Sequence, residues 1–349
     1  MGARPAFTID LVSDTATRPS RGMREAMAAA EVGDEQRGED PTVNALTQKV
    51  AGMLGQEEAI FLPSGTMCNQ IALAVHCLPG DEIIAAGNSH IVASEGAGAA
   101  VLARSVIRGI GPPSGIFSAE ELAAAIRQPN LKAPRSKLVC IEQTNNRGGG
   151  SVWPLETLRQ IIDLAHDRGL RLHMDGARLL NACAASGVSP ERYAKAFDSA
   201  WLDLSKGLGC PIGAVLAGSA EFMREANRWK HRFGGAMRQA GIIAAAGLYA
   251  LEHNVLRLSE DHRNAARFAE QIRTLPGIRL MFYPISTNLV FFDVSDSGLA
   301  TSDIARALAE QGIRIGIESP SVMRAVFHLD IDTAMCDAAA AALKDILFP

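Results

Sequence analysis

The chain has 349 residues, of which 48% are hydrophobic and 21% are charged. This balance is typical of a globular protein, and the length exceeds what one hydrophobic core usually supports, so we expect one large and one smaller domain. The net charge of −4 argues against a nucleic-acid partner.

Cysteine usage and hydropathy predict where the protein works. The six cysteines form no C-x-x-C pair, which favours reduced thiols in a cytoplasmic protein over a disulfide framework or a metal site. Residues 1–7 lack the apolar run of a signal peptide, and the longest apolar stretch, 240–251, is too short to span a membrane. We therefore expect no membrane partner, and we interpret 240–251 as a tightly packed helix in the interior or at a subunit interface.

The first part of the chain alternates between predicted strands and helices. Asp40 and Pro41 open a helix that ends at Gly55, and Ser118 opens another through a capping box. A further helix runs from 154 to 169. Strands are expected at 9–12, 59–62, 82–85, 104–107, 137–142, 170–175, 199–204 and 214–217. This alternation predicts an α/β domain over residues 8–251, with a mostly parallel sheet covered by helices.

The pattern changes after residue 251. Predicted helices lie at 254–274, 302–311 and 333–347, and they are mixed with short strands at 288–293, 314–315 and 325–329. We interpret residues 252–349 as a small C-terminal α+β domain.

The stretch 200–209 carries the strongest chemical signal. It reads as a buried strand that leads into Ser205 and Lys206, followed by Gly207 and Gly209. Desolvation at a strand end favours the neutral amine of a lysine, which is the form that attacks a carbonyl cofactor. The alternative is a lysine whose amine extends into solvent.

Other polar residues follow neighbouring strands, where ligands bind in parallel sheets. The turn 64–66 opens a helix and could bind phosphate, or simply cap that helix. Asp175 precedes Lys206 by one strand–helix–strand unit, so it could pair with a cationic ring nitrogen, or cap a helix. Arg178 and Arg324 are candidate carboxylate ligands, with surface charges as the alternative. His90 could stack on a ring, or act as a structural hydrogen-bonding group.

Taken together, these residues describe a pyridoxal 5′-phosphate (PLP) site. A lysine, an acid for the ring nitrogen, a phosphate turn and two arginines match the needs of that cofactor and of an amino-acid substrate. The chain also lacks the G-x-x-x-x-G-K-[ST] and H-E-x-x-H motifs, and we expect no metal.

The chain resembles the threonine aldolase and aromatic amino acid β-eliminating lyase family of fold-type I PLP enzymes. Seven segments carry the resemblance: 10–15, 38–44, 62–66, 173–178, 204–209, 234–239 and 325–330. The resemblance implies a homotetramer, with a dimer as the minimum unit, that splits a β-hydroxy-α-amino acid into glycine and an aldehyde.

The resemblance also implies a role for each site residue. Lys206 is the Schiff-base lysine, Asp175 pairs with the ring nitrogen, and His90 stacks on the ring; these three are the predicted catalytic residues. Cofactor binding is assigned to Ser64, Gly65, Thr66, His90, Asp175, Arg178, Ser205, Lys206 and Arg238. Substrate binding is assigned to Ser13, Arg178, Arg324, Asn145 and Arg37.

Four departures from the family pattern lie near the chemistry. Asn145 stands where the family has a histidine near the substrate's β-hydroxyl, and Arg37 replaces a tyrosine. His231 is followed by a new Arg232, and Ala236 replaces a glycine. We therefore predict slow threonine cleavage that Asn145→His would accelerate, and Arg37 suggests an acidic or polar substrate side chain. β-Elimination, transamination or a catalytically silent PLP-binding protein are the alternative functions.

Overall fold

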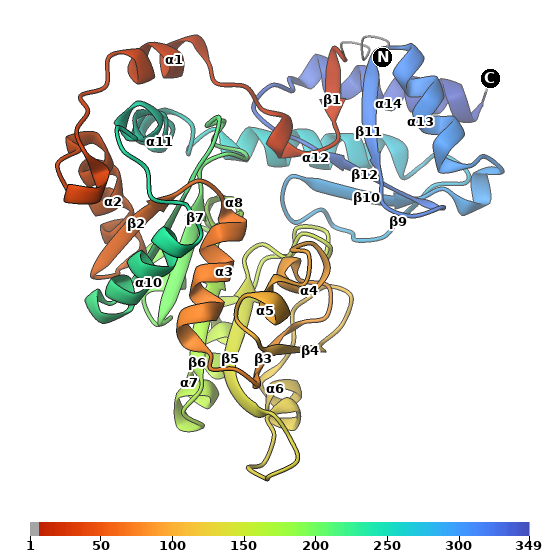
Figure 1. Ribbon diagram of the computed structural model, residues 1–349. Coiled ribbons are helices and arrows are strands. Elements are labelled where there is room, and N and C mark those ends of the chain that lie inside the picture. Colours follow the sequence, from red (N-terminus) through yellow and green to blue (C-terminus); the bar gives the residue numbers. More distant parts are fainter. Residues whose placement is uncertain (1–6, 349) are drawn as a thin grey trace.

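The computed structural model describes residues 7–348 as two sheets with helices around them (Figure 1). The expectation about a signal peptide concerns residues 1–7 and lies, apart from Phe7, outside the described residues. Between residues 7 and 348 there is no helix with the length and apolar character that crossing a membrane requires.

The larger sheet has seven strands in the order β2-β8-β7-β6-β5-β3-β4, and all neighbouring pairs are parallel except the two that involve β8. The strands are β2 (Glu58–Leu62), β3 (Asp81–Ala86), β4 (Val106–Ile110), β5 (Arg135–Glu142), β6 (Arg171–Asp175), β7 (Ser199–Asp203) and β8 (Ala214–Gly218). The predicted mostly parallel sheet is therefore confirmed. Because β8 alone runs the other way, the carboxyl ends of the other six strands lie along one edge.

Two helices around this sheet, α2 and α6, begin at the predicted capping residues. The Asp40 side chain accepts two backbone N–H groups of α2, Gly55 ends that helix with a φ of 66°, and Ser118 forms the capping box of α6. The elements are η1 (Asp14–Ala16), α1 (Arg21–Ala28), η2 (Glu35–Arg37), α2 (Pro41–Leu54), α3 (Gly65–His76), α4 (His90–Ala93), α5 (Gly98–Val101), α6 (Ala119–Ala125), α7 (Leu155–Asp167), α8 (Leu179–Ser186), α9 (Pro190–Ala194), α10 (Ala220–Arg232) and α11 (Gly241–His253).

The apolar stretch 240–251 forms most of α11, which packs inside the chain. Ala244, Ala246 and Ala250 are fully buried, and the helix contacts α1 and α2. The predicted interior helix is confirmed, whereas a role at a subunit interface stays a prediction.

The smaller sheet has five strands in the order β1-β11-β12-β10-β9. They are β1 (Ile9–Leu11), β9 (Arg279–Leu280), β10 (Leu289–Asp293), β11 (Ile313–Ile317) and β12 (Val322–Val326), with α12 (Leu258–Ile272), η3 (Ser295–Ser297), α13 (Thr301–Glu310) and α14 (Thr333–Leu347). Figure 1 shows β1, in red, among the blue C-terminal strands.

The position of β1 corrects the predicted start of the large domain. Ile9 pairs with Ile313 of β11, and Ile9 and Leu11 are buried in the core of the smaller sheet. Residues 9–11 therefore belong to the small domain, because their apolar side chains complete its core. The division of the chain at residue 251 stays a prediction.

β4 and β12 depart most from the expected strand boundaries. β4 begins at Val106 rather than at 104, because Arg104 has a φ of 54°, which lies outside the extended backbone of a strand. β12 covers 322–326 rather than 325–329, because the chain turns after Phe327, where Ile331 donates to the carbonyl of His328. Arg324 consequently lies within a strand and not before one.

Candidate active site

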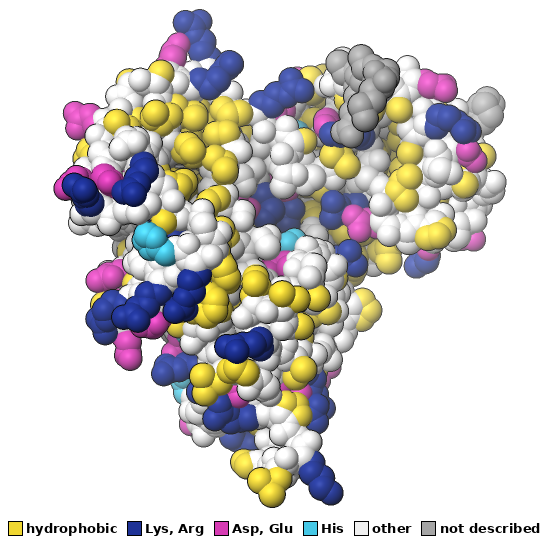
Figure 2. Space-filling view, in the orientation of Figure 1, with side chains coloured by type: hydrophobic (Ala, Val, Ile, Leu, Met, Phe, Trp, Pro, Cys, Tyr) yellow, Lys and Arg dark blue, Asp and Glu magenta, His cyan; other side chains and the backbone are white. Residues whose placement is uncertain are grey.

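A cavity of about 560 Å³ lies where the carboxyl edge of the larger sheet faces the small domain. Figure 2 shows the corresponding hollow between the two parts of the molecule, with basic, acidic and histidine side chains gathered inside it. The residues that line the cavity are Ser13, Thr15, Pro63, Ser64, Gly65, Thr66, His90, Ser94, Glu142, Asn146, Arg147, Asp175, Ala177, Arg178, Trp201, Asp203, Ser205, Lys206, Pro211, Ile212, Glu318 and Arg324.

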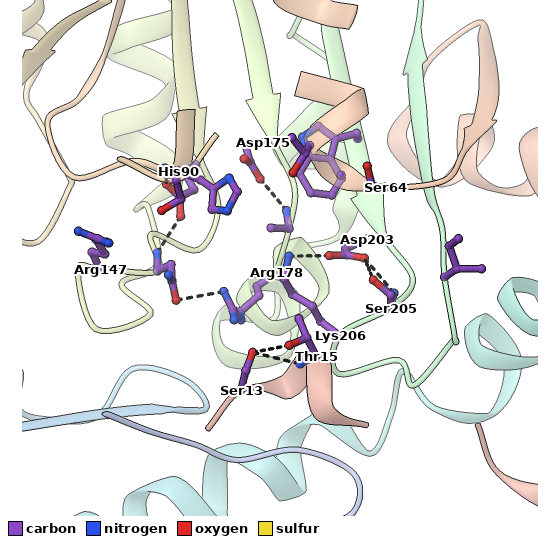
Figure 3. Close-up of a pocket in the computed structure, with 18 of the residues that line it drawn as sticks. Ser13, Thr15, Ser64, His90, Arg147, Asp175, Arg178, Asp203, Ser205 and Lys206 are labelled. Carbon is purple, nitrogen blue, oxygen red and sulfur yellow. Dashed lines mark hydrogen bonds and ion pairs between the residues drawn. The ribbon is translucent and has the colours of Figure 1, made fainter. Parts of the chain in front are cut away.

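Lys206 follows β7 and extends into this cavity (Figure 3). Its Nζ lies 2.5 Å from Oδ2 of Asp203, the last residue of β7, and 5.7 Å from the centre of the Trp201 ring. Ser205 donates both its N–H and its hydroxyl to Asp203, each at 2.8 Å. The turn after β7 thus holds the amine beside a carboxylate and an aromatic wall.

Asp175 ends β6 and is buried beside the cavity. Its carboxylate accepts Nδ2 of Asn69 at 2.8 Å and the N–H of Ala177 at 3.0 Å. Burial raises the pKa of the Asp175 carboxyl, and the Asn69 hydrogen bond opposes that shift. Asp175 makes no ion pair with any residue that the structure describes, so this acid can receive a cation from a ligand in the cavity.

The turn 64–66 forms the N-terminal end of α3 at the cavity wall. Ser64 caps the helix by accepting the N–H of Met67 at 3.2 Å. A Cβ atom on Gly65 would lie 2.2 Å from the Trp201 ring, so only glycine allows this close approach. The first N–H groups of a helix and its dipole attract anions, so this end of α3 can bind a phosphate.

His90 begins α4, and Glu95 holds its ring in place. Nδ1 lies 2.7 Å from Oε1 of Glu95, whose carboxylate also accepts the side-chain amide of Asn69. The hydrogen bond with Glu95 raises the pKa of the imidazole, and burial opposes it. The carboxylate therefore stabilises the protonated ring.

Arg178 reaches the cavity from the N-terminal end of α8, but most of its hydrogen bonds are already taken. Its Nε and Nη2 bind the two oxygens of Asp14 at 2.6 and 2.7 Å, and both side chains are buried. Nη1 remains on the cavity side, 3.4 Å from Oδ1 of Asn146. Sequence reasoning missed Asp14, although its position beside Ser13 after the first strand was a usable signal.

Arg324 reaches the cavity from β12 in the small domain. Its Nη1 lies 3.1 Å from Oε1 of Glu318 and 3.3 Å from the same Asn146 oxygen that faces Arg178. Asn146 therefore brings two guanidinium groups from different sheets to one point. Ser13 lines the cavity nearby, so the predicted carboxylate ligands Ser13, Arg178 and Arg324 come together.

Glu142 is a second acid that sequence reasoning left without a role. It ends β5 directly opposite Asp175 in the sheet, and its oxygens accept the backbone N–H groups of His90 and Asn146 at 2.8 and 2.9 Å. Burial, followed by the nearby Asp175 carboxylate, raises the pKa of Glu142 to about 7.

Three predicted site residues do not line the cavity. Asn145 is fully buried behind its wall, where Oδ1 accepts the N–H of Gly148 at 2.7 Å, so the predicted contact with a β-hydroxyl is corrected. Arg37 and Arg238 are exposed and face Asp34 on the surface of the same chain. They lie outside the cavity because the segments 34–38 and 234–239 pack against each other elsewhere.

The fold and this cavity identify an α/β enzyme whose reactive side chains lie at the carboxyl ends of parallel strands. Residues 10–297 match the family model described as β-eliminating lyase. The low specificity L-threonine aldolase of Escherichia coli (strain K12) is 43% identical over 326 residues, which cover 93% of this chain and 94% of that protein. Low-specificity L-threonine aldolase 1 of Arabidopsis thaliana is 40% identical, with 94% and 93% covered.

Solved structures show the same fold. A Leishmania major threonine aldolase superposes with a TM-score of 0.83 at 20% identity, covering 97% of this chain and 99% of that one. A putative L-allo-threonine aldolase from Listeria monocytogenes gives 0.80 at 23% identity, with 98% and 97% covered. The predicted fold-type I architecture is confirmed, and the chain belongs to the β-eliminating lyase family.

Proposed function

We propose that this protein is a PLP-dependent lyase that cleaves a β-hydroxy-α-amino acid into glycine and an aldehyde. The observation that carries the proposal is the convergence of Lys206, Asp175, the α3 end and two arginines on one cavity. The threonine aldolases at 40% and 43% identity support the same reaction.

The residues present fit the cofactor. Asp175 is a buried acid that has no cationic partner in the described chain, which suits a protonated ring nitrogen. Gly65 lets the Trp201 ring pack against the first turn of α3, and Ser64 and Thr66 at this cavity wall would hold the phosphate. Lys206 would hold the aldehyde carbon. When bound, PLP supplies an electron-withdrawing ring that stabilises negative charge at the substrate's Cα.

The remaining cavity residues position the substrate and move its proton. Arg178 and Arg324 would hold the α-carboxylate, with Ser13 beside them. Cleavage requires loss of the β-hydroxyl proton as the Cα–Cβ bond breaks, and we assign its removal to His90 through Nε2, because Nδ1 is bound to Glu95. Only the neutral imidazole can accept this proton. Since Glu95 raises the pKa of His90, cleavage should accelerate as pH rises through that raised value.

The direct test combines cofactor labelling with product analysis. Borohydride treatment of the holoenzyme should leave the mass of the cofactor on the Lys206 peptide, and β-hydroxy amino acids should yield glycine rather than ammonia. Labelling of Lys195 or Lys230 would overturn the lysine assignment. Ammonia as the main product would replace retro-aldol cleavage by β-elimination, and an amino acid converted to its keto acid would indicate transamination.

We also propose that the protein acts as a cytoplasmic homotetramer with a dimer as the minimum unit. The family resemblance supports this assembly, and the six free cysteines fit a reducing compartment. Light scattering at assay concentration measures the assembly directly, and a fully active monomer would contradict it.

A further inference from the structure

The tight turn 145–151 carries one exposed side chain, that of Arg147, at the cavity. Asn145 and Ser151 form a β-bridge, and the Asn145 side chain accepts the N–H of Gly148. Arg147 is exposed and lines the cavity, while Gly148, Gly149 and Gly150 are all buried. Figure 3 shows Arg147 on the His90 side of the cavity, away from Lys206.

The backbone of this turn packs against three residues that are distant in sequence, and these contacts fix the backbone position of Arg147. A Cβ on Gly148 would lie 2.1 Å from the carbonyl oxygen of Ser114. Cβ atoms on Gly149 and Gly150 would lie 2.5 Å from the Phe282 ring and 2.2 Å from Oγ1 of Thr287. A backbone that is packed this closely has little conformational freedom, so the Arg147 side chain extends from an ordered backbone.

Arg147 also differs electrostatically from the other cations that line the cavity. His90, Arg178, Lys206 and Arg324 each face a carboxylate: Glu95, Asp14, Asp203 and Glu318 respectively. Arg147 makes no hydrogen bond or ion pair to any residue between 7 and 348.

Two of the four acids that line the cavity already face cations. Asp203 and Glu318 hold cations, and Glu142 and Asp175 accept N–H groups. Among the cations that line the cavity, Arg147 is therefore the one that faces no carboxylate between residues 7 and 348.

We propose that Arg147 binds an anionic group on the side chain of the substrate, so that the preferred substrates are acidic β-hydroxy-α-amino acids such as β-hydroxyaspartate. The inference rests on the proposed function, because it places the α-carboxylate on Arg178 and Arg324 and leaves Arg147 for a second anion. The aldehyde released from such a substrate carries a carboxylate. Arg147 thus takes the role that sequence reasoning gave to Arg37.

The experiment measures binding rather than turnover. L-Aspartate and L-asparagine have nearly the same shape, differ in side-chain charge and lack the β-hydroxyl, so neither can undergo retro-aldol cleavage. Calorimetric titration of the holoenzyme should show aspartate binding about five- to tenfold more tightly at low salt. The preference should shrink at 1 M salt, where the screening length falls from about 10 Å at 0.1 M to about 3 Å.

Substitutions then test whether Arg147 is the source of the preference for aspartate. Arg147→Gln should abolish it while leaving asparagine affinity within about twofold, and Arg147→Lys should retain part of it. Arg159 is an exposed arginine of α7 that does not line the cavity, so the control variant Arg159→Gln should keep the wild-type preference. An equal loss of affinity for both ligands in Arg147→Gln would place Arg147 on the α-carboxylate and overturn the proposal, as would no change in either.

The role of Arg147 in substrate specificity and the retro-aldol reaction are tested independently. An aspartate preference that depends on Arg147, in a protein that releases no glycine from β-hydroxyaspartate, would retain the specificity site and reject the retro-aldol reaction. Glycine release without any aspartate preference would retain the retro-aldol reaction and reject the specificity site.

Discussion

Asn146 joins the two halves of the predicted carboxylate site through a single amide oxygen. Arg178 and Arg324 each direct Nη1 at that oxygen, and each already faces a carboxylate, Asp14 or Glu318. Burial lowers the pKa of Arg324, and the Glu318 carboxylate opposes that effect. An incoming α-carboxylate therefore meets two oriented guanidinium groups whose charges are partly balanced.

Arg324→Ala should weaken glycine binding to the holoenzyme about tenfold or more. A charge-assisted hydrogen bond contributes about 1.5–3 kcal/mol, and 1.4 kcal/mol is a factor of ten. Removal of Arg324 also leaves the Glu318 carboxylate to repel the substrate. Calorimetry or cofactor absorbance gives the dissociation constant, and Arg314→Ala on neighbouring β11, which removes an arginine paired with Asp10, is the control. Wild-type affinity in Arg324→Ala would remove this residue from the site.

Asn145→His should destabilise the protein and bring no gain in threonine cleavage. The Asn145 side chain is packed so closely that Cβ atoms on Gly115 and Gly148 would lie within 2.8 Å of it. A larger imidazole would overpack the turn, which costs about 1–3 kcal/mol. Urea unfolding measures the loss. Faster threonine turnover in Asn145→His would restore the original interpretation of this position.

At the scale of the element, α3 connects the phosphate end of the cavity with the buried acid. Ser64 caps the helix, and Asn69, one turn further along, donates to Asp175 and accepts the indole N–H of Trp201 at 2.7 Å. The Trp201 ring in turn lies against Gly65. A shift of the first turn of α3 would therefore move both the anion site and the Asp175 partner.

Gly65→Ala should weaken cofactor binding and lower stability by about 1–3 kcal/mol, because the new methyl overlaps the Trp201 ring. Equilibrium dialysis of PLP and thermal unfolding of the apoprotein measure the two effects separately. Gly52→Ala in α2 is the matched control: no atom lies within 4 Å of the added methyl, so a gain of up to about 1 kcal/mol is expected. Unchanged PLP affinity in Gly65→Ala would exclude the close approach as a requirement of the site.

At the scale of the molecule, Asp14 ties the small domain to the larger sheet. It follows β1, it accepts Nδ2 of Asn288 beside β10 at 3.3 Å, and it holds the buried guanidinium of Arg178. Burial raises the pKa of Asp14, but Arg178 outweighs burial and brings the value down to about 2. The contribution of this ion pair is therefore complete above the ordinary aspartate pKa and is lost as pH falls through about 2.

Asp14→Asn should lower stability by about 3–5 kcal/mol, because Arg178 would remain buried without its carboxylate. Between pH 4 and pH 2 the unfolded wild-type chain binds the proton of Asp14 more readily than the folded one, so wild-type stability falls with acidification. The Asp14→Asn variant lacks this pH-dependent contribution. Its free energy of unfolding, measured by urea titration, should therefore fall less steeply between pH 4 and pH 2. Asp10→Asn, which removes a more exposed partner of Arg314, should cost less than about 1 kcal/mol. Equal losses in the two variants would contradict the structural role of Asp14.

The amino-acid sequence by itself determined the mostly parallel sheet, the capping residues of α2 and α6 and the cluster around Lys206, because strand-end residues of parallel units converge wherever the chain alternates regularly. Tertiary structure alone decided which of the remaining polar residues reach that cluster. Asn145 and Arg147 are two positions apart, yet one is buried behind the wall and the other lines the cavity. The reason is physical: in a tight glycine turn, side-chain direction depends on backbone angles and on contacts with Ser114, Phe282 and Thr287, which are distant in sequence.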